Sequence, residues 1–119
     1  MSNTCQRTYA SLRIQHPTES CEDLSKVLGI PASNAGERCW VFSTECSTNP
    51  ELDDHLFLIL KALENKERQI KELQEDGYQI DIFSYWLSKN GHGGPDIKPA
   101  TMLGLGKLDI QLGIDFYTK

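Results

Sequence analysis

Two aspartates on neighbouring predicted strands have the residue type and spacing that suit acid/base chemistry. Asp81 lies in the run YQIDIFSYWL, residues 78–87, and Asp115 lies in a second alternating run, residues 110–117. Both fall on the same face of their strands, so we expect that they could approach one another. Two adjacent carboxylates shift apart in pKa, and such a pair can supply an acid and a base. Carboxylates on an open sheet face are usually just solvated, and we favour that interpretation over catalysis.

The glycine-rich segment 88–98, SKNGHGGPDIK, is the second chemical candidate. A His-Gly-Gly sequence after a strand is typical of the oxyanion loop of lipases and esterases, but the chain has no G-x-S-x-G motif to supply the nucleophile. A P-loop is excluded, because the only Gly-Lys pair has no following Ser or Thr. The backbone amides of residues 91–94 could form an anion-binding nest beside His92. A mobile crossover loop with an exposed histidine is the favoured alternative.

The other histidines and the cysteines do not form a recognisable site. His16 precedes a proline and His55 lies in the first turns of a predicted helix, so we expect both at a surface or boundary rather than in catalysis. Cys21 lies on an apolar helical stripe and is expected to fill the core. No C-x-x-C pair occurs, so a zinc site would need ligands from separate segments, namely Cys5, Cys21, Cys39 and Cys46. We expect no metal and no cofactor.

Charge and hydropathy limit the classes of partner. The chain has 17 acidic and 12 basic residues, a formal charge of -5, which argues against nucleic acid and is compatible with a basic protein partner. Many soluble proteins without such a partner are equally acidic, and we favour that second interpretation of the charge. The first 13 residues contain no apolar signal segment, and the longest aliphatic and aromatic run, residues 56–60, is too short to span a membrane. We therefore expect a cytoplasmic protein whose thiols stay reduced.

The elements that must position these residues follow from periodicity. With 119 residues, of which 39% are hydrophobic and 24% charged, residues 1–119 are predicted to form one domain with one core. Alternation predicts strands at residues 8–16, 39–44, 78–87 and 110–117. Trp40 and Phe42 are expected to face inward in the second strand, because burying two aromatic side chains gains the most apolar area.

Helical spacing and end signals predict three helical stretches. Thr18 is expected to cap the first, which Gly29 ends; Asn49 is expected to cap the second, since Pro50 suits the first helical position. The second stretch runs to Gly77 and would be about 40 Å long if unbroken, so we expect a kink or break near Asn65. Pro99 is expected to begin a short third helix.

The predicted fold is α+β: a single two-layer domain in the order β-α-β-α-β-α-β. Its four-stranded sheet is expected to be mainly antiparallel or mixed, with the helices packed on one face. Residues 78–87 carry large side chains on both faces, which favours an interior strand beside residues 110–117. There, Gly113 could leave room for Phe83 or Tyr85 to lie across the sheet.

The order of short motifs resembles a bacterial family known only as a domain of unknown function, the one numbered forty-two seventy-nine. The matching residues are Leu28-Gly29-Ile30, Trp40, Ser43-Thr44, Leu56 with Leu60 and Leu63, Gly77-Tyr78, Gly93-Gly94-Pro95 and Leu112-Gly113-Ile114-Asp115-Phe116-Tyr117. The chain departs from the family pattern at Lys98-Pro99, where a Ser or Thr cap is more typical. The resemblance implies an α+β fold and no established activity.

The face of the sheet opposite the helices is the predicted interaction site. Its residues are Tyr9, Arg13, Asp81, Phe83, Tyr85, Asp115 and Tyr117. Tyr and Arg are favoured as binding anchors, so we favour a non-enzymatic domain that binds a protein partner or a second copy as a homodimer, of which an immunity-type protein is one example by size and charge. The alternative is an enzyme or small-ligand binder whose pocket lies between this face and residues 91–94, with Asp81 and His92 as polar groups. A third possibility is that the chain covers the face itself, with residues 32–38.

Overall fold

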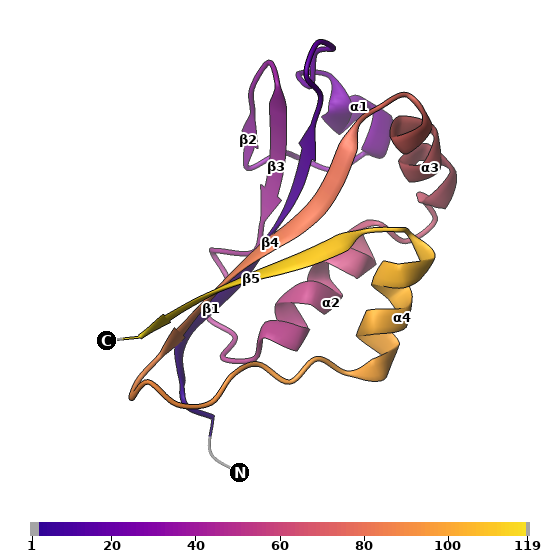
Figure 1. Cartoon of the computed structure of the whole chain (residues 1–119). Helices are drawn as coiled ribbons and strands as arrows, with labels where there is room; N and C mark the ends of the chain where they lie inside the picture. Colours follow the sequence, from indigo (N-terminus) through magenta and orange to yellow (C-terminus); the bar gives the residue numbers. More distant parts are fainter. Residues whose placement is uncertain (1–2, 119) are drawn as a thin grey trace.

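The structure is a computed structural model that describes residues 3–118. Along the chain, the strands are β1 (Cys5–Gln15), β2 (Asn34–Ala35), β3 (Cys39–Ser43), β4 (Gln79–Ser88) and β5 (Gln111–Thr118). The helices are α1 (Leu24–Leu28), α2 (Leu52–Ala62), α3 (Glu67–Glu75) and α4 (Pro99–Lys107). Figure 1 shows all four helices on the same side of one sheet, which confirms the predicted α+β class.

The sheet is mixed and has the order β2-β3-β1-β4-β5. β1 pairs antiparallel with β3 and with β4, whereas β4 and β5 run parallel. β4 is thus an interior strand beside β5, and Phe83 lies directly opposite Gly113, as the two-faced pattern of residues 78–87 predicted. Parallel neighbours need a crossover, and here the glycine-rich segment and α4 supply it (Figure 1).

The core lies between the sheet and the helices. Alternate residues of β1 and β4 point toward the helices and are buried, among them Leu12, Ile82 and Trp86. Trp40 is fully buried and Phe42 packs against the core, so the predicted inward face of β3 is correct. The helices contribute a matching set, Leu28, Leu56, Ile59, Leu63, Ile70 and Leu105.

The predicted four strands and the predicted order were wrong, because the sheet has five strands. Residues 32–38 contain β2, which pairs with the outer edge of β3 and is only two residues long. The order is therefore β-α-β-β-α-α-β-α-β. A strand of two residues is too short to show alternation in the sequence. β2 can therefore be recognised only from its pairing with β3 in the structure.

Two predicted helix starts were also wrong. The backbone N–H groups of Thr18 and Glu19 donate to Nδ1 of His16, at 3.1 and 2.9 Å, so this segment forms a turn and α1 begins only at Leu24. Asn49 accepts a hydrogen bond from the N–H of Glu51, and α2 begins at Leu52. The side chains of His16 and Asn49 thus accept hydrogen bonds from backbone N–H groups in turns that precede the helices. Such local turns commonly compete with helix capping.

The predicted helix ends are correct. Asn65 adopts a left-handed conformation with φ of 65° and separates α2 from α3 at the expected break. Gly29 and Gly77 follow α1 and α3 with φ of 67° and 93°, a conformation that glycine adopts without a Cβ penalty. Pro99 occupies the start of α4.

Candidate functional site

One face of the sheet is free of helices and carries seven of the eight predicted site residues. We call it the open face, and its predicted residues are Tyr9 and Arg13 of β1, Asp81, Phe83 and Tyr85 of β4, and Asp115 and Tyr117 of β5. All seven side chains are half-buried or exposed. Residues 32–38 extend the edge of the sheet through β2 rather than crossing this face.

Three tyrosines form a continuous row across the open face. Tyr9 and Tyr85 are directly paired across β1 and β4, and their rings stack with centroids 5.2 Å apart. Tyr117 lies diagonally across from Tyr85, with centroids 5.0 Å apart and the rings tilted by 35°. Aromatic pairs at these separations stabilise each other by about 0.5–1.5 kcal/mol beyond their burial. The three rings therefore hold one another in place.

A cation covers one end of the row. The guanidinium of Arg7 lies 5.6 Å from the centroid of the Tyr9 ring and donates to the carbonyl of Glu45 at 2.8 Å. Burial, followed by the negative charge of Glu45, raises the pKa of the Tyr9 hydroxyl above 10.0, so Tyr9 stays neutral at physiological pH. The sequence prediction missed Arg7, because it began the strand at residue 8, whereas β1 begins at Cys5 and Arg7 continues its alternation.

Arg13 and Asp81 form an ion pair at the opposite end of the face. They are directly opposite on β1 and β4, and Nε and a terminal nitrogen of Arg13 each donate to one carboxylate oxygen at 2.9 Å. The Asp81 hydrogen bonds raise the pKa of Arg13 above its ordinary value, so the guanidinium remains charged. The guanidinium also lies 5.6 Å from the centroid of Phe83, which joins the ion pair to the aromatic surface.

The predicted approach of Asp81 to Asp115 does not occur. The parallel register pairs Asp81 with Gln111 and Asp115 with Tyr85, so the two carboxylates lie four residues apart along the strands, roughly 13 Å. Asp81 is bound to Arg13 instead, and Asp115 accepts a 3.4 Å hydrogen bond from the hydroxyl of Tyr117. The open face therefore carries separate carboxylates and no dyad.

His92, the eighth predicted residue, lies apart from the open face. Its carbonyl accepts hydrogen bonds from the hydroxyls of Ser88, at 2.8 Å, and Thr4, at 2.9 Å. Ser88 is fully buried on the helix side of β4, and a Cβ at Gly93 would lie 3.6 Å from the ring of Trp86 on that same side. The glycine-rich loop and the open face are on opposite sides of the sheet.

Two backbone amides of this loop, those of Gly91 and His92, already have partners. The N–H of Gly91 donates to the hydroxyl of Ser88 at 3.0 Å, and the N–H of His92 donates to the side-chain oxygen of Asn90 at 3.0 Å. An anion-binding nest needs such groups free and convergent. The amides of Gly91 and His92 are bound to Ser88 and Asn90 and so are not free to form that nest.

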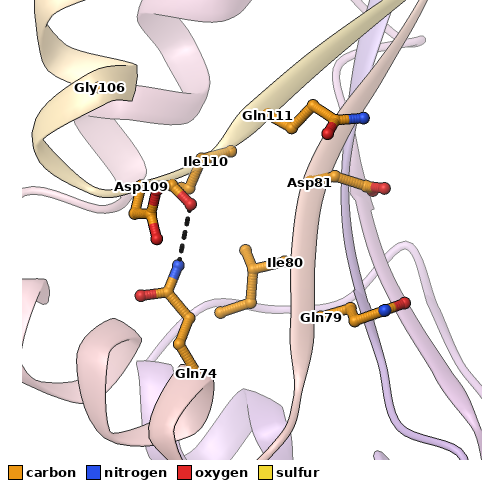
Figure 2. Close-up of a pocket in the computed structure, with 8 residues that line it drawn as sticks. All are labelled: Gln74, Gln79, Ile80, Asp81, Gly106, Asp109, Ile110 and Gln111. Carbon is orange, nitrogen blue, oxygen red and sulfur yellow. Dashed lines mark hydrogen bonds between the residues drawn. The ribbon is translucent and has the colours of Figure 1, made fainter.

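Four surface cavities among residues 3–118 have volumes of about 260 to 530 Å³, and residues 91–94 line none of these four. Figure 2 shows the 530 Å³ cavity, a notch where β4 and β5 separate at their starts. There, the Gln74 amide donates to the carbonyl of Asp109 at 3.1 Å, Ile80 points into the gap, and the Asp81 side chain extends away from it. No buried side-chain nitrogen or oxygen in the described residues lacks a partner.

His55 is buried, and the expectation that it lies at a surface or boundary was wrong. Its two ring nitrogens lie 2.7 Å from the Thr44 hydroxyl and 2.8 Å from the Asn49 carbonyl. A carbonyl can only accept, so Nε2 donates to Asn49, while Nδ1 contacts the Thr44 hydroxyl. His55 therefore ties the end of β3 to the start of α2. Sequence spacing could not reveal it, because both partners lie in the irregular segment before the helix.

The cysteines have different environments. Cys5 and Cys21 are buried, and burial raises the pKa of both thiols above 9.0; Cys39 is half-buried and Cys46 is exposed. Within residues 3–118, no group of three or more His, Cys, Asp or Glu side chains could hold a metal ion. Every helix in the described part of the chain is too short or too polar to cross a membrane.

Comparison with known protein families identifies a match. A family model described as Domain of unknown function (DUF4279) matches residues 6–119, which include every residue of the open face. No curated protein and no solved structure matches the chain. Because this match extends over nearly all of the sequence, the chain belongs to the DUF4279 family of domains of unknown function.

Proposed function

We propose that the protein is a non-enzymatic interaction domain that binds a protein partner through the open face. The observation that carries the proposal is the tyrosine row Tyr9-Tyr85-Tyr117, which is partly exposed on a sheet face that no helix covers. Tyrosine supplies a large apolar ring and a polar tip at low entropic cost, and it is enriched among the residues that dominate binding energy.

The arrangement of charge supports a protein partner. Arg13 and Asp81 neutralise one another and hold each other's side chains in place, so a partner need not order them on binding. The overall charge of -5 would steer a basic protein toward the domain. An immunity-type role, in which a small acidic protein neutralises a basic toxin, is one form of this proposal. Its setting would be the cytoplasm, where free thiols such as the exposed Cys46 stay reduced.

An enzyme or ligand-binding role lacks a comparable basis. The pocket expected between the open face and residues 91–94 would need both groups on one side of the sheet, and His92 and Asp81 lie on opposite sides. The carboxylates of the open face are also separated along the strands. We therefore propose binding without chemistry.

Co-expression with the proteins encoded beside its gene tests the proposal. Tyr85→Ser removes the centre of the row, and Phe57→Ser changes an aromatic residue that is 57% exposed on α2, in the helix layer. A central interface tyrosine contributes about 2 kcal/mol, so we expect the Tyr85 variant to bind roughly 30-fold more weakly by calorimetry. The Phe57 variant should bind like the wild type.

Two results would count against the open face. Equal binding by the wild type and the Tyr85→Ser variant would show that the tyrosine row is not in the contact. Equal losses in both variants would show that binding depends on the helix layer or on stability. Circular dichroism of each variant separates an altered contact from an altered fold.

A further inference from the structure

The two edges of the sheet are unequal. β2 ends one side and is two residues long, whereas β5 ends the other and is eight residues long. Edge strands are commonly blunted by shortness, proline, lysine or a bulge, because free backbone groups invite another strand. β5 contains no proline and no lysine or arginine, and its pairing with β4 runs without a register shift. Its single charged residue is Asp115, so the edge is open and has little protection.

The backbone groups on the outer side of β5 can be assigned. The hydroxyl of Ser84 in β4 donates to the carbonyl of Gly113 at 2.8 Å, so the backbone groups of Gly113 point toward β4. The direction alternates with each residue along a strand. The N–H and C=O groups of Leu112, Ile114 and Phe116 consequently point outward, where water or the backbone of another strand can bind them.

The side chains of the same three residues are apolar and incompletely covered. Leu112 is half-buried, Ile114 is 41% exposed and Phe116 is 44% exposed on the helix side, although Phe116 stacks on Trp86 with ring centroids 5.3 Å apart. A strand that added itself to this edge would both satisfy the backbone and cover these side chains.

We propose that β5 pairs antiparallel with β5 of a second copy about a two-fold axis at Ile114, which joins the two sheets of five strands into one continuous sheet. The sequence of β5 is self-complementary in this register. Leu112 faces Phe116 of the second copy, and about six backbone hydrogen bonds form between the three outward-facing residues of each chain.

Two neighbouring registers are less favourable than this one. With the axis at Ile114, Asp115 faces Gly113 of the second copy. With the axis at Asp115, the two carboxylates would lie directly opposite each other, which is destabilising. With the axis at Gly113, Phe116 would face a residue that precedes the strand. The proposal is independent of the proposed function, because the open face stays uncovered when the edges pair.

Light scattering after size exclusion tests the dimer at concentrations up to about 0.5 mM, enough to populate a complex with a Kd of ~100 µM. Ile114→Lys places a charge on the edge, and Leu103→Lys places the same charge on α4 at a side chain that is 60% exposed. We expect dimers of the wild type and the Leu103 variant, and a monomer of the Ile114 variant. A wild type that is monomeric at every concentration would overturn the proposal.

Disulfide trapping tests the register and does not depend on Ile114→Lys being well folded. In a background with Cys39→Ser and Cys46→Ser, Ile114→Cys should form an intermolecular disulfide at least tenfold faster than Tyr117→Cys, since Tyr117 and its copy would lie about 20 Å apart. Equal rates would overturn the register.

Tyr85→Ser separates this edge dimer from a dimer formed through the open face. We expect the Tyr85 variant to remain dimeric. A dimer that Tyr85→Ser dissolves and Ile114→Lys leaves intact would assign self-association to the open face and overturn the edge proposal.

Discussion

Arg13 makes three contacts that together order one end of the open face. It donates two hydrogen bonds of 2.9 Å to Asp81 and lies over the ring of Phe83. The fork of the guanidinium matches the two oxygens of a carboxylate, which lysine cannot do. The ion pair is partly solvated, with side chains 37% and 26% exposed, so water screens part of its attraction.

A double-mutant cycle measures the strength of this pair. Arg13→Met and Asp81→Asn should each lower the free energy of unfolding by about 1 kcal/mol, and the coupling energy should be about 0.5–1 kcal/mol. Urea unfolding of the four proteins at low and high salt checks both values, and the coupling should shrink with salt. A coupling energy of zero would mean that the pair contributes only orientation.

The residues of the open face could be predicted from sequence, but their mutual distances could not. Alternation assigns Tyr9, Asp81 and Tyr117 to one side of their strands, and the structure places them there. The register between β4 and β5 depends on where the chain leaves α4 and enters β5. The alternation within each strand carries no information about that position. The expected dyad of Asp81 and Asp115 failed for this reason, as did the association of His92 with the face.

Helix boundaries marked by glycine, asparagine or proline were predicted well. Helix starts preceded by a turn that a side chain stabilises were not. Three helices end shortly before Gly29, Asn65 and Gly77, and a fourth begins at Pro99, as the sequence predicted. Near α1, by contrast, His16 takes the backbone donors that a helix would have needed. A propensity argument that treats Thr18 as the cap misses this local competitor, because histidine is not among the usual capping residues.

Two glycines in the C-terminal elements should respond oppositely to alanine. Gly113 has no left-handed backbone, and a Cβ there would meet only the carbonyl of Ile82 at 3.9 Å, so Gly113→Ala should stabilise the protein by about 0.4–1 kcal/mol. Gly93 has φ of 85°, and a Cβ there would press on the Thr4 hydroxyl, so Gly93→Ala should destabilise it by about 2 kcal/mol. Urea unfolding distinguishes the two signs. A stabilising Gly93→Ala would contradict the anchored loop.

At the scale of the molecule, the sheet divides the protein into a sealed side and an open side. The helices, the glycine-rich loop and His55 all belong to the sealed side, where the described buried polar side chains are hydrogen-bonded. The open side carries the tyrosine row and the ion pair. This division explains why substitutions on the open face should change binding more than stability.

The two buried thiols should make the free energy of unfolding depend on pH in the alkaline range. Burial raises the pKa of Cys5 and Cys21 above 9.0, so folding favours their protonated forms. Their contribution is complete below pH 9 and is lost as the pH rises through the raised values. The free energy of unfolding should therefore fall above pH 9. A Cys5→Ala/Cys21→Ala variant should show a shallower fall between pH 9 and 10, and an unchanged slope would exclude the thiols as the cause.

The pairing of β1 with β4 also sets when the chain can fold during synthesis. Cys5 pairs with Ser88, so the middle of the sheet joins segments that are far apart in the sequence. Before residue 88 leaves the ribosome, β1 has an unpaired edge, and such distant pairings form slowly. The same late residues provide Tyr85, Asp115 and Tyr117. A partner that binds the open face, as proposed, can therefore bind only after β4 and β5 have joined the sheet.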